Sequence, residues 1–211
     1  MYPSKAITNF GDVDGDGVTE DLSDDDDMMK VIKWYVKLCT GRFEMESYDN
    51  LELCGWYWFD EAVDVSEGDI QRAALVSKYL EDKCDSQLFW IPYFQAEGYS
   101  SWAQCGFSAA YMQPNYAFDL DVPLSRIENA VKSIKRYNMR IEMEFDPQGL
   151  SNELYYEKYM DYLGKGVEYG YMTQTGHAYY QGITGLYSAC RSSDKRIRLL
   201  YDYTYQFIKG T

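Results

Sequence analysis

The chain has 211 residues, of which 46% are hydrophobic and 26% are charged, so it can bury a substantial core and is not a disordered segment. Its formal net charge is −14, but nine acids and no base lie within Asp12–Asp27, which leaves about −5 for the rest of the chain. We expect no nucleic-acid partner, because the longest basic run, Arg191–Arg198, is interrupted by Asp194, and no membrane span, because no stretch approaches about 20 apolar residues.

The acidic segment at residues 11–27 predicts a calcium-binding loop. Its core, DVDGDG, alternates carboxylates with small residues and glycines, so that oxygen atoms can converge on Ca²⁺. The EF-hand pattern is incomplete, because its twelfth position is Ser23 rather than Glu. We expect a shorter loop with a structural role, and a solvated acidic loop without a metal is the alternative. The predicted ligands are Asp12, Asp14, Asp16, Val18 and Glu20.

Apolar residues at helical spacing alternate with short apolar runs along the rest of the chain. The Asp24–Asp27 run lies favourably at the start of the first predicted helix, and Ser66 and Asp69 are expected to cap the second. The pattern predicts a strand stub at Met1–Pro3, helix Met28–Phe43, strand Leu51–Phe59, helix Ile70–Asp82, strand Gln87–Tyr93, a helical turn at Ser100–Cys105, strand Ser108–Met112, helix Ile127–Tyr137, strand Arg140–Phe145, helix Asn152–Leu163, strand His177–Gln181 and helix Asp194–Ile208.

Two of these strands end in acidic residues. The stretch LELCGWYWFDEA passes through aromatic residues to Asp60 and Glu61. In RIEMEFD, Glu142 and Glu144 share one face of the strand and the apolar residues share the other. Two acid-tipped strands are typical of paired carboxylate chemistry.

The alternation of strands and helices, with strands about 30 to 40 residues apart, predicts βαβ units and a parallel sheet. A dinucleotide-binding fold is disfavoured, because no GxGxxG follows a predicted strand. Acids at the carboxyl ends of strands are instead typical of a (β/α)₈ barrel. The predicted strands, five plus the stub, are fewer than the eight of such a barrel.

The runs GWYWFDEA, FWIPYFQAEGYSSW, GFSAAYMQPNYAFD, RIEMEFD and AYYQG occur in this order, and most of the chain resembles the DUF4855 family of bacterial proteins. The resemblance implies a glycosidase-like (β/α)₈ TIM barrel. Residues 1–211 would then form a single incomplete barrel domain, N-terminally truncated, that runs from the end of strand 3 to strand 8. A complete α/β sheet of five or six strands is the alternative.

The resemblance also implies roles for the acids. The family's Trp-Phe-Glu-Glu pattern stands here as Trp58-Phe59-Asp60-Glu61, so Glu61 is the better match and Asp60 the second candidate. Many retaining barrel glycosidases carry the acid/base after strand 4 and the nucleophile after strand 7, which implies Glu61 and Glu144 in these roles. Glu142 would orient Glu144. The distance between the two carboxyl groups, which distinguishes retention from inversion, is not set by the sequence.

Aromatic residues make up 17% of the chain, and many lie at predicted strand ends. Flat rings pack well against sugar faces, and nearby amides can hydrogen-bond sugar hydroxyls. For any single ring, packing in the core is the alternative. The predicted substrate-binding residues are Trp56, Trp58, Tyr93, Gln95, Gln113, Asn115, Tyr116, Tyr179 and Gln181.

The leading expectation is a glycoside hydrolase that acts on a polysaccharide or oligosaccharide through paired carboxylates. A non-catalytic glycan-binding module and a calcium-dependent structural or adhesion domain are the alternatives. Polysaccharide hydrolases with calcium loops are usually exported, so we expect an extracellular or cell-envelope location, although MYPSKAITNF shows no signal peptide. The sequence sets neither the sugar, the linkage nor the oligomeric state.

Overall fold

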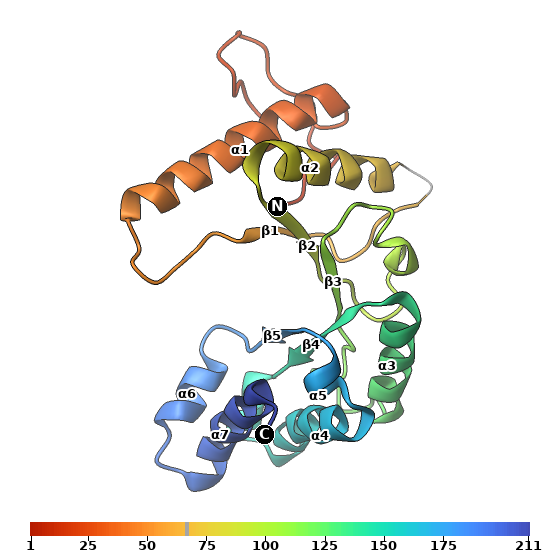
Figure 1. Cartoon of the computed structure of the whole chain (residues 1–211), viewed down its shortest axis with the longest axis vertical. Helices are drawn as coiled ribbons and strands as arrows, with labels where there is room; N and C mark the ends of the chain where they lie inside the picture. The colour runs from red at the N-terminus through yellow and green to blue at the C-terminus, as the bar shows by residue number, and fades with distance from the viewer. Residues whose placement is uncertain (66–67) are drawn as a thin grey trace. The chain divides into compact units, whose positions relative to one another are not determined.

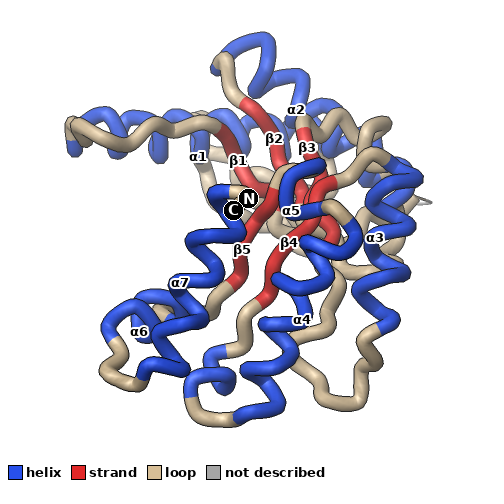
Figure 2. The backbone as a smooth tube through the Cα atoms, turned by 60° about the horizontal axis from the view of Figure 1, so that its bottom comes forward, coloured by secondary structure: helices blue, strands red, loops and turns tan. Residues whose placement is uncertain are grey.

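The computed structural model describes residues 1–65 and 68–211, and the chain forms two compact units. The first unit consists of Met1–Trp90 and Ser101–Ser108, and the second of Ile91–Ser100 and Ala109–Thr211. Parallel strands alternate with helices along the chain in both units (Figure 1 and Figure 2). The predicted mixed α/β organisation is therefore confirmed.

The first unit contains a pair of parallel strands. Gly55 lies opposite Gln87 at one end of the pair and Trp58 lies opposite Trp90 at the other. The helix between the two strands packs on the second strand and also contacts the first helix. The elements are α1 (Asp25–Glu46), β1 (Gly55–Trp58), α2 (Asp69–Cys84) and β2 (Gln87–Trp90).

Aromatic rings form much of the core of the first unit. Trp58 and Trp90 are buried, and Phe107 stacks on Trp90 with ring centroids 5.1 Å apart. Phe107 also packs against the edge of Trp58 at 6.2 Å. The aromatic residues of these strands therefore stabilise the fold by burying large apolar surfaces.

The acidic run fixes the start of α1. The Asp24 side chain accepts hydrogen bonds from the backbone N–H groups of Asp26 and Asp27, which caps the helix. Acidic residues in the first turn also face the positive end of the helix dipole. The helix ends at Ser47 in the left-handed conformation, so it exceeds the predicted Met28–Phe43 at both ends.

A buried arginine connects α2 to this acidic region. Arg72 is 4% exposed and donates a hydrogen bond to the Leu22 carbonyl at 2.5 Å. Its Nε lies 3.3 Å from the Asp25 carboxylate and 3.2 Å from the Met28 sulfur. The chain before α1 is thereby attached to the second helix of the unit.

The predicted capping of α2 by Asp69 is wrong. Gly68, with a φ of 80°, occupies the cap position without a side-chain hydrogen bond. Asp69 is the first helical residue and forms an ion pair with Lys5 at 2.8 Å. The other predicted cap, Ser66, lies outside the described residues.

The N-terminal residues are hydrogen-bonded to β1. The amino group of Met1 donates to the Tyr57 carbonyl, and the Phe59 N–H donates to the Met1 carbonyl at 2.9 Å. This pattern matches that of parallel strands with Met1 opposite Trp58. The predicted stub Met1–Pro3 thus pairs at its first residue, although it is not itself a strand.

The second unit contains three parallel strands in chain order. Tyr111 lies opposite Arg140 across the first pair, and Glu144 lies opposite Tyr180 across the second. The elements are β3 (Ala109–Met112), α3 (Ser125–Tyr137), β4 (Arg140–Glu144), a 3₁₀ turn η2 (Pro147–Leu150), α4 (Glu153–Tyr169), α5 (Tyr171–Gln174), β5 (His177–Tyr180), α6 (Gly185–Arg191) and α7 (Lys195–Lys209).

The core of the second unit is formed by β4 and the buried faces of α3, α4 and α7. Ile141, Met143 and Phe145 are fully buried, and Phe145 packs against Tyr159 of α4 with ring centroids 5.0 Å apart. On α7, Leu200 and Phe207 are buried. The stripe predicted on this last helix therefore does face the core.

The predicted elements differ from the observed ones mainly at their ends. The strand predicted at Leu51–Phe59 is observed only as the four residues of β1, Gly55–Trp58. The residues before Gly55 are exposed and do not pair with β2. The helical turn predicted at Ser100–Cys105 overlaps a 3₁₀ turn, η1 (Tyr99–Ser101). The elements η2, α5 and α6 were not predicted from the sequence. None of the described helices has the length and apolar character needed to cross a membrane.

Candidate functional site

The acidic residues of β4 lie on one face of the strand, as predicted from the alternation. Glu142 is 7% exposed and Glu144 is fully buried. Their neighbours across the sheet, on the same face, are Ala178 and Tyr180 of β5. Both carboxyl groups are therefore enclosed by protein near the carboxyl end of a parallel strand.

Two hydrogen-bond donors converge on one oxygen of Glu144. The Tyr162 hydroxyl, from α4, donates to Oε2, and the backbone N–H of Tyr116 donates to the same oxygen at 3.3 Å. Burial, together with the adjacent charge of Glu144, raises the pKa of Tyr162 well above its usual value. Tyr162 therefore keeps its proton and remains a hydrogen-bond donor to the carboxylate.

A second set of contacts holds these donors in place. The Tyr171 hydroxyl donates to the Tyr162 carbonyl. The Tyr116 hydroxyl donates to Asp161 at 2.6 Å, and the Tyr116 and Tyr162 rings pack edge to face at 5.7 Å. Burial raises the pKa of the Tyr116 hydroxyl, with the Asp161 hydrogen bond adding to the effect. The surroundings of Glu144 are thus a connected network of tyrosines.

Lys158 of α4 fixes the loop that follows β3. Its ammonium group is buried and donates to the carbonyls of Tyr116 and Val122, each at 2.9 Å. It also lies 3.7 Å from the centre of the Tyr116 ring, a cation–π contact. Burial lowers the pKa of this lysine. Lys158, Asp161 and Tyr162 were not predicted as site residues, although their i, i+3, i+4 spacing places them on one helix face.

An aromatic pair is exposed beside this network. Tyr180 lies directly across the sheet from Glu144, and its ring packs edge to face with Phe118 at 5.4 Å. Tyr180 is 47% exposed and Phe118 is 40% exposed. Neither residue was predicted as a site residue. Exposed rings next to buried carboxyl groups are suited to contact a sugar face.

The other predicted acids, Asp60 and Glu61, follow β1 in the first unit. Asp60 accepts a hydrogen bond from the Ala62 N–H at 3.1 Å, and its carbonyl accepts one from the Trp90 indole at 2.7 Å. Glu61 is exposed. Because Glu61 belongs to the first unit and Glu144 to the second, their pairing stays a prediction.

The predicted aromatic ligands differ in exposure. Trp56, Trp58 and Tyr116 are buried, so their rings serve packing in the structure. Tyr93 is 37% exposed, and Tyr179 is half-buried. Burial raises the pKa of Tyr179 to about 12, so its hydroxyl stays protonated at neutral pH.

The predicted amide residues already have local roles. Gln113 is buried and donates to the Ile91 carbonyl at 2.9 Å. Gln181 accepts the N–H of Leu186 at 2.8 Å, near the start of α6. Gln95 and Asn115 have left-handed backbones, with φ of 64° and 51°. These residues lie in the loops that follow β2, β3 and β5.

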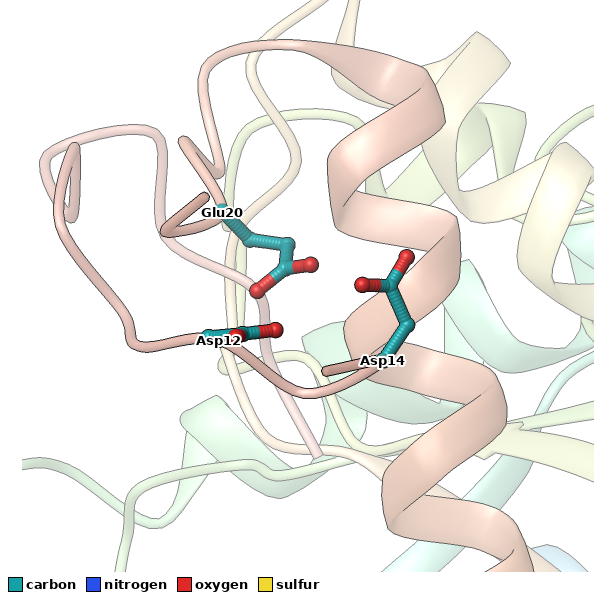
Figure 3. Close-up of side chains that lie close together, drawn as sticks. All are labelled: Asp12, Asp14 and Glu20. Atoms are coloured by element: carbon teal, nitrogen blue, oxygen red, sulfur yellow. The ribbon is translucent and has the colours of Figure 1, made fainter. Parts of the chain in front are cut away.

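The acidic loop brings three of its predicted ligands together. The carboxylate oxygens of Asp12, Asp14 and Glu20 lie within 4.8 Å of one another and face a common centre (Figure 3). Asp16 is not part of this group, and its carboxylate accepts the Val18 N–H at 2.8 Å. The Val18 carbonyl as a ligand stays a prediction.

The backbone of the loop stabilises the charge of Asp12. Its carboxylate accepts the N–H groups of Gly15 at 2.6 Å and Gly17 at 2.9 Å. Both glycines have positive φ, which residues with a side chain rarely adopt. The Gly17 hydrogen bond, followed by that of Gly15, lowers the pKa of Asp12 below its usual value. Asp12 is therefore charged at neutral pH.

Comparison with known proteins identifies the family. The sequence model of the domain of unknown function DUF4855 matches residues 1–206, nearly the whole chain. The chain therefore belongs to the DUF4855 family, as its motifs had indicated. No curated protein and no solved structure matches it.

Proposed function

We propose that this member of the DUF4855 family is a glycoside hydrolase built on a partial (β/α)₈ barrel and acting on a polysaccharide or oligosaccharide. The observation that carries the proposal is the arrangement at the end of β4. Glu144 accepts a hydrogen bond from Tyr162 and lies across the sheet from the exposed Tyr180–Phe118 pair. A fixed carboxylate beside an aromatic platform suits the cleavage of a glycosidic bond.

Each acid has a specific role in this proposal. Glu144 attacks the anomeric carbon, or activates the water that does so, while a second acid protonates the leaving oxygen. The sequence motifs assign this second role to Glu61. Glu142, two residues earlier on the same face, orients Glu144, and Asp60 supports Glu61. The Tyr162 hydroxyl holds the Glu144 carboxylate in one orientation during the reaction.

The burial of Glu144 sets a condition on this mechanism. The carboxylate is enclosed, so a sugar must displace covering groups before the anomeric carbon can reach it. The Tyr116 segment, whose backbone N–H donates to Glu144 from the loop after β3, is one of these covering groups. Substrate binding would therefore involve movement of this loop.

The same burial favours a second candidate, a glycan-binding module without hydrolysis. The exposed Phe118 and Tyr180 rings can bind a sugar whether or not Glu144 reacts. In that case Glu144 and Tyr162 would stabilise the platform and take no part in chemistry. The two candidates differ in what happens to the bound glycan.

The experiment measures release of reducing sugar from a panel of polysaccharides by the full-length protein. Glu144→Gln and Glu61→Gln should each lower turnover at least about 1000-fold, since each removes one of the two carboxyl functions. Glu157→Gln is the matched control, because Glu157 is an exposed glutamate of α4. Full activity in both variants on a hydrolysed glycan would contradict the proposal. Glycan binding without any product would favour the binding module.

A location outside the cytoplasm accompanies this proposal, because large polysaccharides are met there. Fractionation of cells that express the natural gene, followed by immunodetection, tests the location. Recovery only in the cytoplasmic fraction would argue against a polysaccharide substrate and leave soluble oligosaccharides as the class to screen.

A further inference from the structure

The acidic loop contains a buried carboxylate whose hydrogen bonding is incomplete. Glu20 is 1% exposed. Its Oε2 accepts the Val13 N–H at 3.0 Å, while no described residue donates a hydrogen bond to Oε1. Leaving a charged oxygen in this state is costly, and buried carboxylates are normally completed by a donor or a cation.

The position of Glu20 is fixed by the backbone at the base of the loop. The Phe10 N–H donates to the Glu20 carbonyl at 2.9 Å, and the Glu20 N–H donates to the Gly11 carbonyl at 3.2 Å. These hydrogen bonds close the loop and direct the side chain toward Asp12 and Asp14 (Figure 3). The three carboxylates are therefore brought together by the fold of the loop rather than by free side-chain rotation.

One side-chain cation approaches the group without completing it. The Lys30 ammonium lies 3.6 Å from Asp14 and 3.9 Å from Oε1 of Glu20, both beyond normal hydrogen-bond length. It lies closer to Asp27, at 3.1 Å. A single ammonium cannot neutralise the three carboxylates of the group, and Asp27 competes for it.

The spacing of the carboxylates is compatible with Ca²⁺. Two oxygens bound to the same Ca²⁺ lie at most about 5 Å apart, whereas around Mg²⁺ the limit is about 4.2 Å. One carboxylate oxygen from each residue lies within 4.8 Å of the others, a separation that Ca²⁺ can span. An all-oxygen set also disfavours the softer transition metals.

We propose that Asp12, Asp14 and Glu20 bind one Ca²⁺ ion, which takes the place that the Lys30 ammonium partly fills. The ion coordinates Oε1 of Glu20, the oxygen without a hydrogen-bond donor among the described residues. The Lys30 ammonium then pairs with Asp27 alone. The role is structural, because the ion holds together three carboxylates of the loop that precedes α1. This inference does not depend on the hydrolase proposal.

The test is calorimetric titration of the metal-free full chain with CaCl₂ in about 150 mM KCl, where diffuse counterion binding is screened. We expect one site with a dissociation constant below about 1 mM. Glu20→Gln should weaken binding at least about tenfold, because it removes the buried ligand charge. Lys30→Gln should strengthen binding, because no ammonium has to be displaced. Asp26→Asn, an exposed acid at the same end of α1, should change the affinity less than about twofold.

Thermal unfolding distinguishes a variant that has lost a calcium ligand from a variant that no longer folds. In EDTA, Glu20→Gln should unfold at the same temperature as the natural chain or higher, because it replaces a buried charge of which one oxygen, Oε1, receives no hydrogen bond from the described residues. At saturating Ca²⁺ the natural chain should gain about 5 °C or more, and the variant should not. The proposal would be overturned if Ca²⁺ at concentrations up to 10-fold above about 1 mM gave neither a heat of binding nor a shift in the unfolding temperature. Equal weakening by Glu20→Gln and Asp26→Asn would also overturn it, since binding would then reflect diffuse charge alone.

Discussion

The Tyr162 hydroxyl donates a hydrogen bond to the buried carboxylate of Glu144. Tyr162→Phe removes this donor and leaves a charged oxygen with the weaker Tyr116 N–H contact. We expect a loss of about 1–3 kcal/mol in the free energy of unfolding, measured by urea denaturation. Hydrolysis, where present, should also fall, because the carboxylate loses its fixed orientation.

A double-mutant cycle separates this bond from simple loss of packing. Tyr162→Phe in a Glu144→Gln background should cost less than in the natural chain, with a coupling energy of at least about 1 kcal/mol. Tyr155→Phe, on the same helix and half-buried, is the control and should show no coupling to Glu144. Strict additivity of the two substitutions would contradict a direct interaction.

The exposed pair Tyr180 and Phe118 should determine glycan binding. Tyr180→Ala and Phe118→Ala should each weaken binding by about 1–2 kcal/mol, about five- to thirtyfold in dissociation constant, because each removes an aromatic face. Affinity electrophoresis in polysaccharide gels measures the change. Tyr187→Ala removes a tyrosine that is 66% exposed on α6 and should leave the mobility unaltered. A loss as large for Tyr187 would mean that the sugar binds elsewhere.

Two glycines of α4 should respond to alanine with opposite signs. Gly164 has open space around it, so Gly164→Ala should stabilise the helix by about 0.5–1 kcal/mol. A methyl group on Gly166 would overlap the Phe207 ring and lie 2.8 Å from Tyr171, so Gly166→Ala should destabilise by about 1–3 kcal/mol. Chemical denaturation of both variants measures the difference. Stabilisation in both would show that α7 packs less closely on α4 than described.

The acidic loop should lose stability at low pH. The pKa of Asp12 in the folded chain lies below its usual value of 3.8, owing to the Gly17 and Gly15 hydrogen bonds. Its contribution is therefore complete above about pH 5 and declines as the pH falls through the lowered folded pKa. Thermal midpoints of the natural chain and of Asp12→Asn, recorded in EDTA, should differ near neutral pH and converge in acid. A difference that stays constant down to pH 2, with both chains folded, would contradict this assignment.

The sequence predicted the order of the five strands and of the five longer helices, because periodicity and polar caps act locally. In RIEMEFD, the alternation placed Glu142 and Glu144 together, as observed. It did not indicate that both faces of β4 would be covered, since burial of Glu144 depends on α4 and on the loop after β3. A residue's contacts across the fold are not encoded in its immediate neighbours.

The tyrosines illustrate the same limit. Tyr162 reads as part of an apolar helical stripe, and only the structure shows its hydroxyl directed at a carboxylate. Trp58 and Tyr116 stand in motifs that suggest sugar platforms, yet both are buried, while the exposed Tyr180 and Phe118 were overlooked. The helices α5 and α6 were missed because four and seven residues are too few for a periodic signal.

Arg72 has a practical consequence for work on this protein. Its guanidinium, enclosed within the first unit, depends on the carbonyl of Leu22 for a hydrogen bond. Trimming the acidic segment up to α1, a natural choice for simplifying crystallisation, would remove that acceptor and leave the buried guanidinium with the Asp25 carboxylate, 3.3 Å from its Nε. Shortened versions of the protein should therefore retain Leu22, or replace the arginine with a neutral residue of similar length.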